Sequence, residues 1–113
     1  MTLMLCSIVI PAYNEEKRIE KTLEVYTKYF GKRKINYEII VVCDGCTDNT
    51  ISIVSKFMEK HDIIKLEAEK VRHGKAYALN KIYKLFTGDF LMTIDADLVL
   101  LGSNSLDHMI DTL

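Results

Sequence analysis

The stretch YEIIVVCDG (residues 37–45) decides the fold of this chain. Its centre is a run of four β-branched apolar residues without polar alternation, which is typical of a strand buried on both faces of a parallel sheet. The run passes directly into an acid and a glycine, and both residue types favour turns. Residues 37–42 are therefore predicted to form a buried strand, with Asp44 just beyond its carboxyl end.

Three further apolar runs repeat this pattern, at residues 5–10, 63–66 and 90–94. The first is closed by Pro11 and the polar residues after it, and the last ends in Asp95-Ala96-Asp97. Each run has the length of a short strand. Four strands are thus predicted, and three of them end in polar or acidic residues.

Apolar side chains at helical spacing separate these runs. The predicted inner faces are Ile19, Leu23, Tyr26 and Phe30 in one helix, Ile51, Val54 and Met58 in a second, and Ala78, Ile82 and Leu85 in a third. Asn14 is the predicted N-cap of the first helix, with Glu15 and Glu16 in its first turn, and Thr47 or Asp48 caps the second. Gly74 opens the third helix, and Ser103 or Ser105 starts a last one.

Strict alternation of strands and helices predicts an α/β fold with three layers, α/β/α, around a parallel sheet. Ligands of such folds bind outside the carboxyl ends of the strands. We call the loops at those ends the carboxyl rim: residues 11–15, 43–45, 72–75 and 95–97. Polar and acidic residues converge there while the strand bodies are apolar, so the rim is the predicted binding site.

Asp95 and Asp97 are the candidate metal ligands. Residues two apart in a strand share a face, so both carboxylates are predicted to point the same way. Two neighbouring carboxylates suit a hard cation such as Mg²⁺ or Mn²⁺. A solvated turn after a strand is the alternative, since Asp is a common turn residue.

Bulk composition excludes several classes of protein. The chain has 113 residues, 49% of them hydrophobic, and a formal net charge of −1, which argues against a nucleic-acid partner. No apolar stretch approaches the roughly 20 residues that span a bilayer, and the first residues lack a basic signal-peptide region.

The sequence contains neither the glycine-rich motif of dinucleotide-binding proteins nor the P-loop motif. We expect a cytoplasmic location, or the cytoplasmic face of a membrane if the protein is longer.

Cys43 and Cys46 form a C-x-x-C at the mouth of a βα turn. Such a pair is the redox site of thioredoxin-like proteins, so a thiol redox protein is a rival interpretation. The odd total of three cysteines instead fits a reducing compartment without structural disulfides.

Four segments in order carry a resemblance to a known family: residues 9–16 (VIPAYNEE), 39–48 (IIVVCDGCTD), 73–80 (HGKAYALN) and 95–97 (DAD). They resemble the motifs of the inverting nucleotide-sugar glycosyltransferases of family 2, especially the branch of dolichyl-phosphate-mannose synthases and polyprenyl-phosphate glycosyltransferases. The resemblance implies the Rossmann-like, nucleotide-binding half of a GT-A fold, with strand order 3-2-1-4. It also implies a hexosyltransferase whose donor is a nucleoside-diphosphate sugar, either a UDP-sugar or a GDP-sugar.

The resemblance assigns nucleoside contacts to the first two segments. It implies that Pro11, Ala12, Tyr13 and Glu15 line the nucleoside pocket, with Tyr13 against the base. Asp44 would accept a hydrogen bond from a ring N–H of the base. From the residues alone, Tyr13 packing on the first helix and Glu15 acting as a surface acid near the helix dipole stay open as alternatives.

The later segments are assigned to the diphosphate. Lys75, together with Arg72, would lie near it, and Asp95 and Ala96 would contact ribose and phosphate. Asp97 would hold the Mg²⁺ or Mn²⁺ that bridges the diphosphate. Such a metal neutralises charge on the leaving nucleoside diphosphate as the glycosidic bond breaks.

Two departures from the family pattern affect this site. Cys43 and Cys46 stand where the family has an acid and a serine, which changes the loop around Asp44. Tyr77 stands near the place of a second glycine, so a close backbone approach to phosphate is less favoured.

The family's catalytic domain continues past the acidic motif, so we expect the acceptor site and the general base beyond Leu113. Inverting transfer to a hydroxyl needs that base. We therefore expect residues 1–113 to bind a donor without turnover, with a polyprenyl phosphate or a glycan as the acceptor of the complete enzyme. A non-catalytic nucleotide-binding module is the alternative. The fourth strand would be an exposed edge, and we expect self-association through it.

Overall fold

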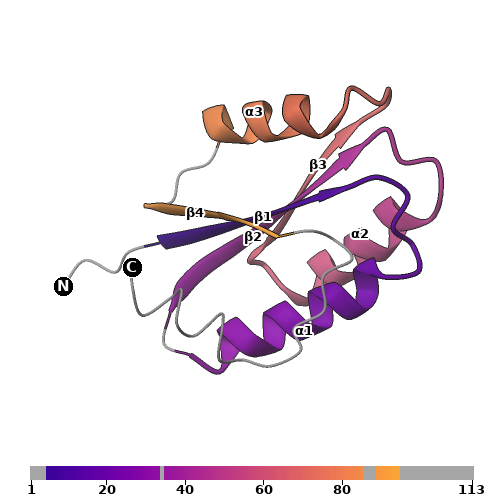
Figure 1. The fold of residues 1–113 in the computed structure, drawn as a ribbon. Helices are drawn as coiled ribbons and strands as arrows, with labels where there is room; N and C mark the ends of the chain where they lie inside the picture. Colours follow the sequence, from indigo (N-terminus) through magenta and orange to yellow (C-terminus); the bar gives the residue numbers. More distant parts are fainter. Residues whose placement is uncertain (1–4, 34, 86–88, 95–113) are drawn as a thin grey trace.

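The computed structural model describes residues 5–33, 35–85 and 89–94 (Figure 1). The elements are β1 (Leu5–Ala12), α1 (Ile19–Gly31), β2 (Asn36–Asp44), α2 (Thr50–Lys60), β3 (Ile64–Glu69), α3 (Lys75–Leu85) and β4 (Phe90–Thr93). The four strands form one sheet in the order β3-β2-β1-β4, and every pairing is parallel. The α/β class and the 3-2-1-4 order predicted above are therefore confirmed.

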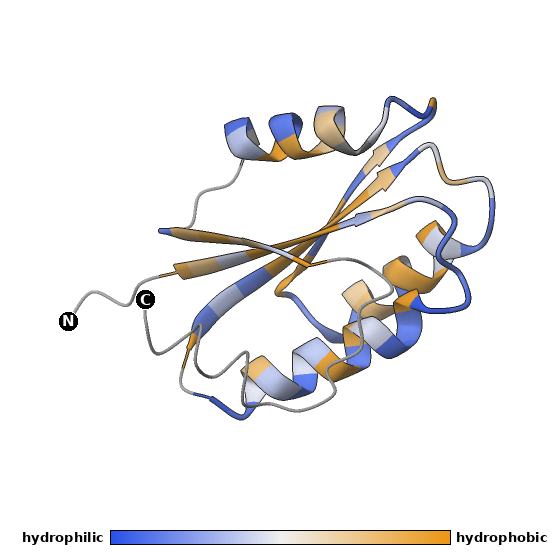
Figure 2. Cartoon of the chain, viewed as in Figure 1, coloured by the Kyte–Doolittle hydropathy of each residue, from blue (hydrophilic) through white to orange (hydrophobic). Residues whose placement is uncertain are grey.

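Helices cover both faces of the sheet, as three layers require (Figure 1). Helices α1 and α2 lie on one face and α3 on the other, and Figure 2 shows apolar residues concentrated in the strands between them. The predicted stripe of α1, Ile19, Leu23, Tyr26 and Phe30, is buried in the larger core on the α1 and α2 side. A smaller core lies under α3, where Ala78 and Ile82 meet Val9, Ile40 and Val42.

Strand β1 runs two residues further than predicted, through Pro11 to Ala12. The backbone N–H of Ile94 donates to the carbonyl of Val9 at 2.9 Å, so the main-chain polar groups of Val9 face β4. Those of Pro11, two residues on, face the same way, past the level at which β4 ends at Thr93. The described pairing of β1 with β4 ends at Val9 and Thr93, so Pro11, which has no N–H to donate, stands beyond it.

The predicted cap of the first helix is wrong. Helix α1 begins at Ile19, so Asn14 lies outside it and Glu15 and Glu16 are not in its first turn. The side chain of Asn14 is engaged by the β2–α2 loop instead, as described below. The predicted cap of the second helix is displaced as well: the N-cap is Asn49, whose side chain makes no capping bond, although Asp48 accepts a hydrogen bond from the N–H of Thr50, the first residue of α2, at 2.9 Å.

One residue of the predicted inner face of α2 is also misplaced. Val54 is fully buried, but Met58 is 37% exposed, and Phe57 packs against the core instead. A step of one residue turns a helix by about 100°, so a short stripe fixes its face poorly. The side chain of Leu85 is not among those that the structure describes. The last predicted helix lies entirely outside the described residues.

Strand β4 lies at one edge of the described sheet, beside β1. Self-association through this edge stays a prediction. Within the described residues, no helix is both long enough and apolar enough to cross a membrane.

Replacing Leu23 by alanine should lower the free energy of unfolding by about 2–5 kcal/mol, because it opens a cavity in the larger core. Met58→Ala is the matched control on the exposed side of α2 and should change it by about 0.5 kcal/mol or less. Urea unfolding followed by circular dichroism measures both. Equal losses for the two variants would contradict the assignment of faces.

Candidate functional site

The carboxyl rim brings together the loops that follow β1, β2 and β3. The parallel register places Ala12 beside Cys43 and Asp44 beside Glu69. The three loops therefore leave the sheet side by side, and the predicted convergence is present for these strands. Asp95, Ala96 and Asp97 lie outside the described residues.

Asp44 is a buried and well anchored side chain of the rim. It is 5% exposed, and its two carboxylate oxygens accept hydrogen bonds from the backbone N–H groups of His73 at 2.8 Å and Gly74 at 2.7 Å. A buried carboxylate is expensive unless it is hydrogen-bonded, and bonds from N–H groups to a charged acceptor are among the stronger ones. Asp44 thus ties the end of β2 to the residues that open α3.

Gly45 lets the β3–α3 loop approach the end of β2. Its φ is +73°, and a Cβ built on it would lie 2.5 Å from the backbone nitrogen of Arg72 and 2.9 Å from the carbonyl carbon of Val71. Its own N–H donates to the carbonyl of Glu69 at 2.9 Å. Only glycine combines this backbone conformation with this close contact.

Tyr13 and Arg72 contact each other across the rim. The guanidinium carbon of Arg72 lies 3.9 Å from the centroid of the Tyr13 ring, and the ring is 40% exposed. The structure thus gives Tyr13 a partner outside the first helix. Beside this pair, the rings of His73 and Tyr77 lie with centroids 4.2 Å apart.

Asn14 joins the β1–α1 loop to the β2–α2 loop. Its φ is +50°, and its side-chain oxygen accepts hydrogen bonds from the N–H groups of Thr47 at 2.8 Å and Asp48 at 3.2 Å. Its own N–H donates to the Cys46 sulfur at 3.4 Å. Asparagine tolerates the left-handed region better than most residues, and this was the available sequence signal for a role other than capping.

A second set of bonds locks the same two loops. The N–H of Glu15 donates to the Thr50 hydroxyl at 2.9 Å, and the N–H of Glu16 donates to the Asp48 carboxylate at 3.1 Å. Burial would raise the pKa of Asp48, but hydrogen bonds from Thr50 and Glu16 outweigh it and lower that pKa. A hollow of about 400 Å³ lies at this junction and includes Glu15 in its lining. The two loops form one rigid platform.

The cysteine pair does not have the properties of a redox site. Both thiols are free, and burial, helped by the neighbouring Cys46, raises the pKa of Cys43. A redox cysteine needs a lowered pKa, because the thiolate is the nucleophile. Cys46 serves the loops instead: it lies 3.5 Å from the carbonyl of Ala12, within hydrogen-bonding distance. This argues against the thiol redox interpretation.

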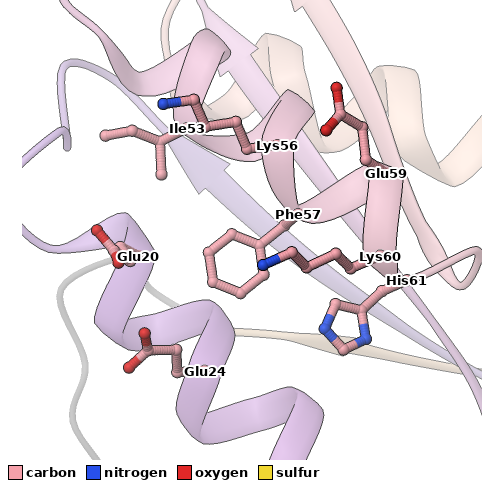
Figure 3. A pocket seen from close by; sticks show the side chains of 8 residues that line it. All are labelled: Glu20, Glu24, Ile53, Lys56, Phe57, Glu59, Lys60 and His61. Atoms are coloured by element: carbon pink, nitrogen blue, oxygen red, sulfur yellow. The ribbon is translucent and has the colours of Figure 1, made fainter.

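A larger hollow of about 600 Å³ lies between α1 and α2 and contains none of the predicted site residues (Figure 3). Acidic side chains of α1 line it together with acidic and basic side chains of α2 and the Phe57 ring. The lining residues are Glu20, Glu24, Ile53, Lys56, Phe57, Glu59, Lys60 and His61.

No metal centre forms among the described residues, which contain no group of three or more His, Cys, Asp or Glu able to hold an ion. The carboxyl end of β4 points to the rim because β4 is parallel to β1, and Asp95 and Asp97 follow it in sequence. Carboxylates are the donors that a hard cation such as Mn²⁺ prefers, so these two acids stay the predicted metal ligands.

The remaining predicted site residues lie at the rim as well. Pro11 is half-buried and Ala12 buried at the end of β1, and Glu15 lies 3.8 Å from the Arg18 guanidinium. Lys75 begins α3, and its side chain is outside what the structure describes. The loops after β1, β2 and β3 thus meet as the sequence predicts, whereas the roles of Asn14, Cys46 and Thr50 in fastening them were not predicted.

Comparison with known proteins gives consistent results. Residues 7–113 match the family described as Glycosyl transferase family 2. Relatives include the Bacillus subtilis protein named "Probable glycosyltransferase YdaM", 41% identical over 95 residues, and a dolichyl-phosphate beta-glucosyltransferase of Trichomonas vaginalis, 36% identical over 107 residues. The matches cover 80% and 90% of this chain, and 22% and 31% of those proteins.

Among solved structures, a mannosyltransferase from Pyrobaculum calidifontis in complex with GDP-Man and Mn²⁺ matches with a TM-score of 0.80 and 29% identity. That match covers 97% of this chain and 32% of the mannosyltransferase. The chain therefore spans less than a third of the length of these proteins.

Asp44→Asn should lower the free energy of unfolding by about 1.5–3 kcal/mol, because an amide offers one oxygen to two N–H donors. Asp62→Asn, on an exposed residue, is the control and should change it by about 0.5 kcal/mol or less. Hydrogen exchange of the His73 and Gly74 amides should accelerate in Asp44→Asn alone. Unchanged exchange there would contradict the anchoring role.

Stability should fall as the pH rises above about 9, the ordinary thiol pKa, because the unfolded chain then releases the Cys43 proton while the folded chain retains it. Cys43→Ala should weaken this dependence, measured by chemical unfolding between about pH 8 and 10.5. Part of the pH dependence should persist in Cys43→Ala, since burial also raises the pKa of Cys6. If the stability of the wild-type protein and of Cys43→Ala depended on pH in the same way, the raised pKa of Cys43 would be refuted.

Proposed function

This chain belongs to glycosyl transferase family 2, and we propose that its carboxyl rim binds a nucleoside-diphosphate sugar, UDP- or GDP-linked, for transfer of the sugar to an acceptor. The main observation in support is the arrangement of the rim, where three hydrogen-bonded loops present the exposed Tyr13, the buried Asp44 and Arg72. The mannosyltransferase of the same fold, solved with GDP-Man and Mn²⁺, supports this class of donor.

The nucleoside would lie against the first two loops. Tyr13 offers an exposed ring on which a base can stack, and Pro11, Ala12 and Glu15 would line the pocket beside it. Asp44 would accept a ring N–H of the base. A carboxylate has about four lone-pair positions, so the two bonds from His73 and Gly74 leave capacity for a third.

The diphosphate would lie towards the β3–α3 loop and the end of β4. Arg72 and Lys75 supply positive charge there, and Asp95 and Ala96 would contact ribose and phosphate. The carboxylates of Asp97 and Asp95 would hold Mn²⁺ or Mg²⁺. When bound, the ion neutralises charge on the leaving nucleoside diphosphate.

Transfer with inversion joins an acceptor oxygen to the anomeric carbon as the bond from that carbon to the diphosphate breaks. A hydroxyl acceptor must give its proton to a general base. None of the residues assigned above has that role, so we propose that the base belongs to sequence outside these 113 residues, and that this chain binds donor without turnover. The relative named for dolichyl phosphate supports a polyprenyl phosphate as one acceptor class beside a glycan hydroxyl; a phosphate acceptor attacks as an anion and needs no such base.

A nucleotide-binding module without catalysis is the second candidate, and the same contacts support it. The two differ in turnover. Release of nucleoside diphosphate from a labelled donor by the full-length protein, with a polyprenyl phosphate present, would identify the transferase.

Thermal unfolding should reveal the donor. At about 100 times its Kd, the correct nucleotide adds roughly 2.7 kcal/mol to the folded state, and a small domain shifts by roughly 4–8 °C per kcal/mol. We expect a shift with UDP or GDP and their sugars that depends on Mn²⁺ or Mg²⁺ and disappears in Asp97→Ala.

Asp62→Ala is the control for that variant, because it removes an exposed acid at the other end of β3. It should leave the shift intact. If no nucleotide moves the midpoint of the wild-type protein, with or without metal, the proposed function is wrong.

A further inference from the structure

We propose that Arg72 is a gate on the base-stacking face of Tyr13. Its guanidinium lies over the ring, 3.9 Å from the centroid. A nucleoside base displaces it, and the released guanidinium then binds the diphosphate of the same ligand. This inference rests on the proposed function, since it assigns an order of events to the same site.

The backbone at Arg72 is fixed, so only its side chain can move. Gly45 packs against the Arg72 main chain with no room for a methyl group, and Asp44 holds the next two amides, of His73 and Gly74. The Arg72 side chain itself is exposed, and so is Tyr13. A long flexible side chain on a rigid loop is suited to moving between two nearby partners.

Relative contact strengths favour the exchange. Contact of a guanidinium with an exposed ring strengthens their association by a factor of about 2–5. Stacking of a base on an aromatic side chain strengthens binding of the base by a factor of about 5–150. A base therefore replaces the guanidinium readily. The planar guanidinium matches the geometry of phosphate oxygens, so its second position is also favourable.

The gate predicts effects of opposite sign for two ligands. Arg72→Ala uncovers the ring, so a nucleoside without phosphates should bind about 2–5 times more tightly. The nucleoside diphosphate should bind about tenfold more weakly, because a charged contact to phosphate is lost. A residue that simply lined the pocket would weaken both ligands.

The test is titration of guanosine, uridine, GDP and UDP, the diphosphates with Mn²⁺, into wild-type protein, Arg72→Ala and Lys70→Ala. Lys70 is an exposed cation of the same loop, so Lys70→Ala removes the same charge without uncovering Tyr13. NMR shifts of the Tyr13 ring protons report the stack directly. They should change in ligand-free Arg72→Ala and stay unchanged in ligand-free Lys70→Ala.

Tighter nucleoside binding with weaker diphosphate binding, in Arg72→Ala alone, is the expected result. The gate is refuted if Arg72→Ala leaves nucleoside affinity unchanged or weakens it, if Lys70→Ala matches it, or if the free-state Tyr13 shifts do not respond. A wild-type protein that binds none of the four ligands removes the proposed function instead, whatever the NMR shifts show.

Discussion

The rim depends on one buried carboxylate. Asp44 lies at the end of β2 with almost no exposure, and its two oxygens accept the backbone N–H groups of His73 and Gly74. Since an unsatisfied buried charge is not tolerated, the β3–α3 loop must stay within reach of this side chain. Gly45 makes the approach possible by having no Cβ where the Arg72 backbone passes. The position of the start of α3, and of everything that Arg72 can contact, follows from this pair of residues.

The rim combines a rigid platform with one adjustable part. Asn14, Asp48 and Thr50 fasten the first two loops through several backbone N–H groups, which holds the end of β1 against that of β2. The third loop is anchored through Asp44. Within the part of the rim that the structure describes, the Arg72 side chain over the exposed Tyr13 ring is free to change position. Rigid supports with a mobile side chain are a common physical solution for a site that must be preorganised and still admit a ligand.

Most of the fold could be predicted from local pattern, and the site only in part. Continuous apolar runs identify buried strands, and the Ile19 to Phe30 stripe identifies α1, because both signals depend on neighbouring residues. The strand order came from resemblance to a family. Met58 was misplaced because a short helix stripe leaves its face ambiguous by one residue. The role of Asn14 was missed because its partners, Thr47 and Asp48, lie in another loop, and local sequence does not encode that pairing. The same reason applies to the contact of Tyr13 with Arg72.

Pro11 gives the rim a feature that no side chain supplies. The main chain at this residue faces past the described end of β4, and proline has no N–H to offer there. Any strand continued alongside β1 at this level would meet a backbone position that cannot donate a hydrogen bond. Pro11 therefore removes one donor from the edge of β1 that faces β4, just before the rim. A missing backbone hydrogen, and not a side chain, limits how strongly a neighbouring strand can pair with β1 at this level.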